Sequence, residues 1–269
     1  MTEHDGHSTI TVTSERDGAV EVVSLNRPER MNGITQTMVD ELGAYFRAKA
    51  TDTTTRVIVL RGEGRAFCAG LDIKEQQAGG DRPVFVEGRV SLSDLPVLIH
   101  LAPQVVIALL HGGVSGGGFA IALAADFRFA GRSLKMNDAF ARIGMSGCEM
   151  GVSYFLPRIV GVPVARELIY TGRFVDADRA LAIGLVSGVV DDDELPTAAD
   201  GLIDDLLAVS PFGLRQSKRT LDRCLGVDDL ATVVAIEIGA QQACQETGDF
   251  TEALRAFVEK RPPVFRPLG

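Results

Sequence analysis

Apolar and polar positions along the first 60 residues follow the periods of strands and helices in turn. Thr9 to Ser14 and Ala19 to Leu25 are strand-like runs on either side of an Arg-Asp-Gly turn signal, which predicts a pair of strands. Thr35 is a suitable N-cap for a helix that ends near Ala50. A short buried strand is expected over 56–61. The apolar face of the predicted helix consists of Met38, Leu42, Tyr45 and Phe46.

The alternation continues through the middle of the chain. Residues 62–83 have the composition of a loop, and residues 84–102 are predicted to form a helix. A strand over 105–110, a helix over 116–125 that opens on glycines, and a strand over 126–130 follow. This rhythm of strand, helix and strand favours an α/β fold with right-handed crossovers.

From Pro163 onward the pattern becomes mainly helical, and a proline suits the first turn of a helix. We therefore expect an α/β core over 1–200 and a helical C-terminal segment over 201–269 that serves as a lid or an oligomerisation surface. The predicted elements are helices over 163–170, 177–184, 194–209, 213–224, 228–246 and 249–259, with a brief strand over 185–190.

Composition narrows the class of protein. A chain of 269 residues, 46% of them hydrophobic, suits one large globular domain. No apolar run reaches the roughly 18 residues that a membrane span needs, and the polar N-terminus lacks a signal-peptide layout. A formal charge of −9 argues against nucleic-acid binding. We expect a cytoplasmic protein without a metal site, since four cysteines are dispersed along the chain and are expected to be free thiols: Cys68, Cys148, Cys224 and Cys244.

Two glycine-rich loops carry the main chemical signal. One spans residues 62–73 and the other residues 115–119, and each follows a strand-like apolar run. The first is not a dinucleotide fingerprint, because its third glycine is missing, and it lacks the Gly-Lys-Ser/Thr ending of a phosphate loop. Two such turns are able to aim backbone N–H groups at one developing oxyanion. Taken alone, the pair is explained equally well by two ordinary turns.

Further segments match a known family. Taken together, the motifs resemble the crotonase (enoyl-CoA hydratase/isomerase) superfamily, and they occur in the family's order over nearly the whole chain. The resemblance implies a spiral of ββα units that binds thioesters of coenzyme A between the two loops, with no cofactor beyond the coenzyme A of the substrate. The matching segments are Leu25–Asn32, Gly64–Asp72, His111–Gly112 with Gly116–Gly118, Leu156–Gly161, Thr171–Arg173 with Ala180–Val186, and Ala256–Arg261.

The resemblance also assigns roles to particular residues. The oxyanion donors map to the backbone N–H groups of Leu71 and Gly117, and two fixed donors are what a thioester enolate requires. Family members commonly assemble as trimers or hexamers, so we expect a homotrimer or hexamer. The residues that the resemblance places at the coenzyme A moiety are Arg27, Arg30, Ala69 and Lys74, together with Phe257 and Lys260, which would reach the ligand of a neighbouring subunit.

The acid/base positions depart from the hydratase pattern. Where family hydratases carry two glutamates, this chain has Ala120 and Phe140, neither of which moves a proton. Glu149 lies two residues before Gly151, a placement similar to that of the acidic residue in dienoyl-CoA isomerases. It is the leading acid/base candidate, and a solvated loop carboxylate is the alternative. Asp138 is read as a strand-end turn residue that could assist.

Three classes of function remain open at this point. The chain is expected to be an enoyl-CoA hydratase (lyase) or an enoyl-CoA isomerase, and a single base fits isomerisation better than hydration. It is alternatively an acyl-CoA-binding member without turnover. A third class, thioester hydrolysis or decarboxylation, would use the same oxyanion site.

Overall fold

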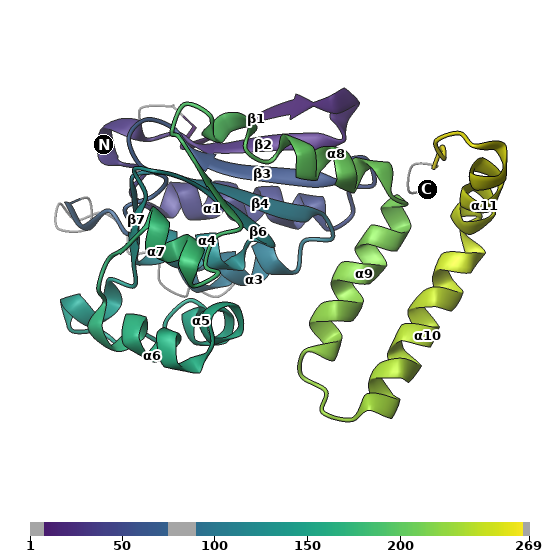
Figure 1. The fold of residues 1–269 in the computed structure, drawn as a ribbon. Helices are drawn as coiled ribbons and strands as arrows, with labels where there is room; N and C mark the ends of the chain where they lie inside the picture. Colours follow the sequence, from purple (N-terminus) through teal and green to yellow (C-terminus); the bar gives the residue numbers. More distant parts are fainter. Residues whose placement is uncertain (1–7, 75–89, 266–269) are drawn as a thin grey trace.

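The larger of two sheets has the strand order β1-β2-β3-β4-β6-β9, and every pair except β1–β2 is parallel. The structure is a computed structural model that describes residues 8–74 and 90–265. Helices cover both faces of this sheet, and a helical arm extends away from one end of it (Figure 1). The six strands are β1 (Ile10–Glu15), β2 (Val20–Leu25), β3 (Val57–Gly62), β4 (Val105–Leu110), β6 (Phe127–Gly131) and β9 (Gly188–Val190).

A second, three-stranded sheet joins short segments that follow the large strands. Its order is β5-β7-β8, with β5 and β7 parallel and β7 and β8 antiparallel. Because strands of two or three residues leave little local trace in the sequence, none of the three was predicted. The strands are β5 (Gly113–Ser115), β7 (Lys135–Asn137) and β8 (Val175–Asp176).

Ten helices belong to the described residues, and α1, α3 and α4 share one face of the large sheet in Figure 1. The predicted start of α1 is confirmed, because the Thr35 side chain accepts a hydrogen bond from the Met38 N–H. The helices are α1 (Gln36–Lys49), α3 (Leu95–His100), α4 (Gly117–Ala124), α5 (Val152–Val160), α6 (Val162–Thr171), α7 (Ala177–Ala182), α8 (Asp200–Ala208), α9 (Pro211–Cys224), α10 (Leu230–Glu246) and α11 (Asp249–Glu259).

The parallel strands are buried on both faces, which explains their continuous apolar runs. On β3, Ile58 and Leu60 belong to the core under α1, α3 and α4, whereas Val57 and Val59 belong to a second core with α8. The predicted apolar face of α1 is confirmed, since Leu42 is fully buried. Burying a leucine side chain contributes about 1.5–3 kcal/mol, so this face fastens α1 to the sheet.

Two predicted helices begin later than expected. The prediction over 84–102 is wrong for residues 90–94, and residues 84–89 lie outside the described residues. Ser91 and Asp94 form a capping box that starts a 3-10 turn, and α3 follows from Leu95. The prediction over 194–209 likewise divides into a 3-10 turn at Leu195–Thr197 and helix α8. Helix α5 was not predicted, and it contains Pro157 in its interior.

Helices α9, α10 and α11 form the arm, which is the segment over 211–259. In Figure 1 α9 and α10 run side by side away from the sheet, and α10 buries none of its residues. The large apolar side chains of the arm that stand exposed are Leu221, Leu225, Leu230, Val234, Ile238, Phe250, Leu254, Phe257 and Val258. The expected boundary at residues 200 and 201 falls inside α8, which packs on the sheet, and the division into two domains stays a prediction.

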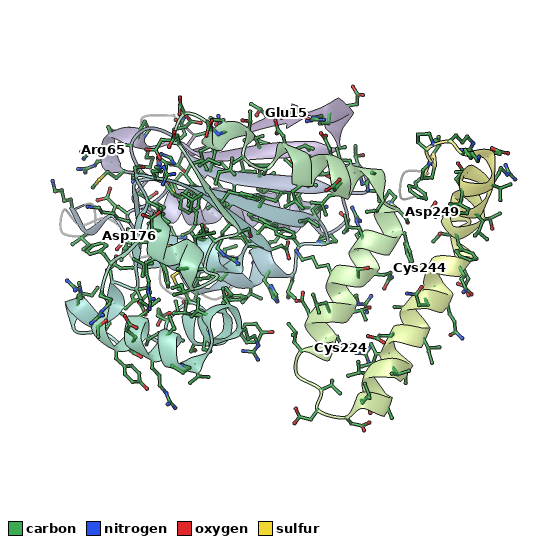
Figure 2. The ribbon with its side chains drawn as sticks, in the orientation of Figure 1. Glu15, Arg65, Asp176, Cys224, Cys244 and Asp249 are labelled. Carbon is green, nitrogen blue, oxygen red and sulfur yellow. The ribbon has the colours of Figure 1, made fainter. Side chains whose placement is uncertain are left out.

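None of the helices in the described ranges combines the length and the apolar character that crossing a bilayer requires. All four cysteines carry free thiols. Figure 2 shows Cys224 and Cys244 at separate levels of the arm, on α9 and α10 respectively.

Candidate active site

A buried asparagine, Asn32, holds the first glycine loop in place through hydrogen bonds. The Asn32 side-chain amide donates to the carbonyl oxygens of Glu63, Ala66 and Phe67 at 2.9, 2.8 and 3.1 Å, and its Oδ1 accepts from the Arg27 N–H at 2.8 Å. Asn32 is fully buried and adopts φ +53°. Because asparagine tolerates the left-handed region and carries both donors and an acceptor, it satisfies several loop carbonyls at once.

The pairing of this loop fixes the direction of the Leu71 N–H. The Ile34 N–H donates to the Gly70 carbonyl at 2.8 Å, and the Asp72 N–H donates to the Ile34 carbonyl at 3.0 Å. Since successive residues of an extended chain direct their N–H groups to opposite sides, the Leu71 N–H points away from Ile34. Leu71 donates to no acceptor within the described parts of the chain.

The second glycine loop lies directly against the first. The Ser115 N–H donates to the Cys68 carbonyl at 3.0 Å, which joins β5 to the first loop. Gly70 has φ +90°, and a Cβ on it would lie 2.7 Å from the Ser115 oxygen and 3.5 Å from the Gly117 nitrogen. Glycine is therefore required at Gly70 both for its backbone conformation and for this close approach. The two loops thus bring Leu71 and Gly117 into one region.

Helix α4 begins at Gly117, so the N–H of Gly117 has no acceptor inside the helix. It also donates to none elsewhere in residues 8–74 and 90–265. The positive end of the helix dipole lies at the same place. Backbone N–H groups without partners at a helix start favour a negatively charged or carbonyl oxygen of a ligand.

The Cys68 thiol lies beneath these loops and is not reactive. It is fully buried, and its Sγ contacts the Asn32 carbonyl oxygen at 3.1 Å. Burial raises the pKa of the Cys68 thiol to about 12, because a thiolate there would lose its hydration. Cys68 therefore stays a neutral thiol that packs in the core.

Glu149 approaches the two loops through its neighbour Met150. A Cβ on Gly117 would lie 3.5 Å from the Met150 Sδ, so the loop over 144–151 packs against the start of α4. Met150 is buried and has φ +51°, whereas Glu149 is half-buried. Ser93 donates a 3.0 Å hydrogen bond to the Glu149 Oε1. The carboxylate is therefore oriented by a hydroxyl from the turn that precedes α3.

The two positions where hydratases carry glutamates, and Asp138, have different surroundings from that of Glu149. Ala120 is fully buried inside α4, and Phe140 is half-buried at the start of a 3-10 turn over Phe140–Ile143. Asp138 is fully buried, and its Oδ1 accepts from the Phe140 N–H at 3.3 Å, while its Oδ2 has no partner within residues 8–74 and 90–265. Burial raises the pKa of Asp138 to about 6.

A cavity of about 260 Å³ opens beside the first glycine loop. Among its lining residues are Ala69, Leu71, Arg30 and Lys74, so the structure brings four of the predicted site residues together. Arg30 is partly exposed, with its Nε 3.7 Å from the Asp72 carboxylate, and Lys74 is exposed. The cavity thus has cationic side chains at its rim and the Leu71 backbone in its wall.

Arg27 has a different place from that of Arg30. Its side chain is largely buried, and its Nη1 donates to the Gly33 carbonyl at 2.5 Å and to the Asp72 carboxylate at 3.1 Å. Arg27 therefore holds the turn before α1 to the first glycine loop. These contacts give the Asp72 carboxylate a structural role.

Phe257 and Lys260 lie at the end of α11, in the arm. Phe257 is 83% exposed, and Lys260 is the C-cap of the helix with φ +54°. No residue of α11 lines the cavity beside Leu71. Within this single chain the structure does not bring Phe257 and Lys260 to the other site residues.

Four residues that hold the loops in place were not predicted from the sequence. These are Asn32, Ser93, Asn137 and Met150, of which Asn137 accepts from the Gly116 N–H through its carbonyl and from the Ser115 hydroxyl through its Oδ1. Only Asn32 had a local signal, because asparagine is enriched in the left-handed conformation. Across the described ranges, no three His, Cys, Asp or Glu side chains form a group that would hold a metal ion.

Comparison with known proteins identifies the family. The family profile described as enoyl-CoA hydratase/isomerase matches residues 15–267. The chain belongs to the enoyl-CoA hydratase/isomerase family. Membership confirms the predicted class of enzyme, and it agrees with the resemblance carried by the two glycine loops.

Individual members of the enoyl-CoA hydratase/isomerase family are similar over most of their length. A probable enoyl-CoA hydratase of Mycobacterium bovis is 35% identical over 250 residues, which cover 90% of this chain and 88% of that protein. A 1,2-epoxyphenylacetyl-CoA isomerase of Escherichia coli is 31% identical over 257 residues, covering 94% and 97% respectively. The crystal structure of an enoyl-CoA hydratase from Bacillus anthracis superposes with a TM-score of 0.87 at 32% identity, covering 96% and 98%. The predicted crotonase-like α/β fold is thereby confirmed.

Proposed function

We propose that this protein shifts the double bond of an acyl-CoA thioester, with Glu149 as the acid/base and the N–H groups of Leu71 and Gly117 as donors to the thioester oxygen. The observation that carries the proposal is the packing of Met150 against Gly117, because Glu149 is the residue next to Met150 in the chain. Two N–H groups without an acceptor among the described residues, together with a half-buried carboxylate, are the groups that enolate chemistry needs.

The proposed reaction proceeds through an enolate. The Glu149 carboxylate removes a proton from carbon next to the double bond, and the electron pair moves toward the thioester oxygen. The N–H groups of Leu71 and Gly117 stabilise the negative charge that develops there. Return of the same proton to a different carbon completes the isomerisation and leaves the mass of the substrate unchanged.

Isomerisation is favoured over hydration by the residues at the other two positions. Adding water usually requires one group to activate the water and another to protonate carbon. The side chains of Ala120, which is buried, and Phe140, which is half-buried, supply neither, and Asp138 has no exposed surface through which to reach a substrate. Glu149 alone suffices to remove and return one proton. The names of the relatives include both hydratases and an isomerase, so they do not separate the two reactions.

The coenzyme A portion is proposed to bind along the cavity beside the first glycine loop. Arg30 and Lys74 at its rim would meet phosphate oxygens, and Ala69 lies in the wall next to Leu71. Arg27 would act by fixing Asp72 and Arg30, since its own guanidinium is engaged with Gly33 and Asp72. No cofactor beyond the coenzyme A of the substrate is proposed.

Self-association is part of the proposal. The arm exposes a large number of apolar side chains, and a homotrimer or hexamer would cover them. In such an assembly Phe257 and Lys260 would reach the ligand of a neighbouring subunit, which accounts for their distance from the cavity within one chain. A cytoplasmic location remains the expectation from the sequence.

The test is incubation with trans-2-enoyl-CoA and cis-3-enoyl-CoA, followed by mass analysis and chromatography against standards. An equal mass with a moved double bond supports the isomerase, and a gain of one water supports a hydratase instead. Release of free coenzyme A or of carbon dioxide would indicate thioester hydrolysis or decarboxylation. Tight binding of the thioester without any product, unchanged in Glu149→Ala, would support a binding protein.

A further inference from the structure

The loop that carries Glu149 is held at two points. On one side Met150 packs against Gly117, as described above. On the other side Gly147 is wedged between Asp138 and the end of α6: a Cβ on Gly147 would lie 2.9 Å from the Asp138 Oδ2 and 2.7 Å from the Ile169 carbonyl oxygen. Glu149 lies between these two contacts, so its position depends on both.

Asp138 is unusual in this environment because its carboxyl group meets no cation and only one donor in the part of the chain that the structure describes. It is 0% exposed, and the Phe140 N–H bonds only the Oδ1 atom, which leaves the Oδ2 atom without a described hydrogen-bond partner. An ionised carboxylate buried in this way would leave a full charge unpaired, which is costly. A protonated carboxyl group carries a donor on Oδ2 and removes that charge.

The end of α6 favours the same protonation state. Ile169 lies in the last turn of α6, where carbonyl groups lack helical partners and the helix dipole is negative. The Ile169 carbonyl and the Asp138 Oδ2 approach the same point on Gly147. A carboxylate would be repelled by the carbonyl, whereas a protonated Oδ2 is able to donate toward it.

Other charged groups around Asp138 do not compensate its charge. Cys148 of the loop, Arg142 of the 3-10 turn, and Arg166 and Tyr170 of α6 are exposed. Arg142 lies over the Phe174 ring, Glu149 accepts from Ser93, and Glu167 pairs with Arg173 and Arg179. None of these groups forms a described ion pair or hydrogen bond with Asp138.

We propose that Asp138 is a positioning residue: as a neutral carboxylic acid it holds the loop of Glu149 against the end of α6, and loss of its proton to solvent releases the loop. This inference rests on the proposed role of Glu149. Asp138 also connects to the second glycine loop, because the adjacent Asn137 accepts from the Gly116 N–H and donates to the Gly172 carbonyl at 3.0 Å. The pair Asn137–Asp138 therefore fixes both loops of the proposed site relative to each other.

The deciding experiment is hydrogen exchange of the peptides over 139–151 as a function of pH, without any substrate. The measured quantity is the ratio of the exchange rate of this segment to that of α5 in the same molecule. In the wild-type protein this ratio should rise about tenfold from about pH 5 to about pH 8, because each unit by which the pKa is raised changes the equilibrium between the held and the released loop by a factor of ten. Asp138→Asn keeps a donor at the same place and does not titrate, so its ratio should stay constant. Asp178→Asn, at an exposed aspartate, should behave as the wild type.

An exchange ratio that is independent of pH in the wild-type protein overturns the proposal, and this measurement needs no variant to fold.

Activity supplies a second readout. If turnover occurs, kcat should fall in the wild type as pH rises through about 6 and should not fall in Asp138→Asn. An unchanged exchange ratio together with loss of activity in Glu149→Gln would reject the role of Asp138 while leaving the proposed function intact. A pH-dependent exchange ratio in a protein without turnover would support the role of Asp138 and reject the proposed function.

Discussion

Ser93 donates a hydrogen bond of 3.0 Å to the carboxylate of Glu149, and the two residues lie 56 positions apart in the sequence. The contact joins the turn before α3 to the loop that packs on α4. It gives the candidate base a fixed orientation, and this orientation is the contribution of the Ser93 hydroxyl to the proposed reaction. A net hydrogen bond is worth about 0.5–1.5 kcal/mol, so its loss should have a modest but measurable effect.

Replacement of the candidate base should remove most of the activity. We expect Glu149→Gln to lower kcat by at least about 100-fold, since general acid/base catalysis typically contributes that much. Ser93→Ala should lower kcat by about 2- to 10-fold. Both are measured as initial rates with an enoyl-CoA substrate. Full activity of Glu149→Gln would exclude Glu149 as the proton carrier.

The close approach of the two glycine loops predicts a second loss of activity. Gly70→Ala would push a Cβ toward the Ser115 oxygen and the Gly117 nitrogen, so we expect kcat to fall by about 100-fold or more, as for the loss of one oxyanion donor. Gly248→Ala is the matched control. Gly248 has a similar φ of +82° with nothing within 4 Å of a Cβ, so it shares the backbone strain and leaves the loops intact. Equal activity of the two variants would contradict the arrangement of donors.

The attachment of the arm to the core predicts an effect on stability. Lys218 of α9 donates to the Asp126 carboxylate at 2.7 Å and to the Gln104 carbonyl at 2.8 Å, and its side chain is only 10% exposed. We expect Lys218→Met to lower the free energy of unfolding by about 2–4 kcal/mol, because the partly buried Asp126 carboxylate would lose its cation and keep only the Val106 N–H as a donor. The measurement is unfolding in urea.

A surface ion pair provides the control for this prediction. Arg16 and Asp204 approach to 2.6 Å, yet both side chains are well exposed. Solvent screens such a pair, so Arg16→Met should change the free energy of unfolding by no more than about 1 kcal/mol. Similar losses of unfolding free energy in the two variants would show that the stabilisation by the Lys218–Asp126 ion pair does not depend on its burial.

The apolar surface of the arm predicts that single substitutions disrupt assembly. Ile238 of α10 is 53% exposed, and we expect Ile238→Glu to shift the protein from a trimer or hexamer toward smaller species in light scattering. The control is Val12→Glu on β1, where the side chain is 43% exposed but lies away from the arm. A monomeric wild-type protein would contradict the predicted self-association.

Asp138 predicts a pH dependence of stability with a defined sign. Its pKa is raised in the folded protein from 3.8 to about 6, so the folded state binds this proton more tightly than the unfolded state does. The stability contributed by the protonated carboxyl group is complete below the unfolded pKa and is lost as pH rises through the folded pKa. The Tm of Asp138→Asn relative to the wild type should therefore increase between about pH 4 and pH 7. A constant difference would indicate an ordinary pKa.

Much of the fold follows from local patterns in the chain. The strands β1 to β4 and the helices α1 and α4 lie within one or two residues of the predicted ranges, because long apolar runs and an N-cap leave a strong local signal. The same is true of α10 and α11. The two glycine loops and the family were also predictable, since their motifs depend on residues that are close together in the sequence.

The sequence by itself determined the family, the α/β fold and the identity of the residues that form the two glycine loops. Only the tertiary structure decided that Arg27 is engaged with Asp72, that Ser93 orients Glu149, and that Asp138 is buried with no cation beside it among the residues described. These features depend on contacts between segments far apart in the chain, and locally each residue resembles an ordinary polar loop position. Burial and partners set the protonation and orientation of a side chain, and neither is encoded in the residues next to it.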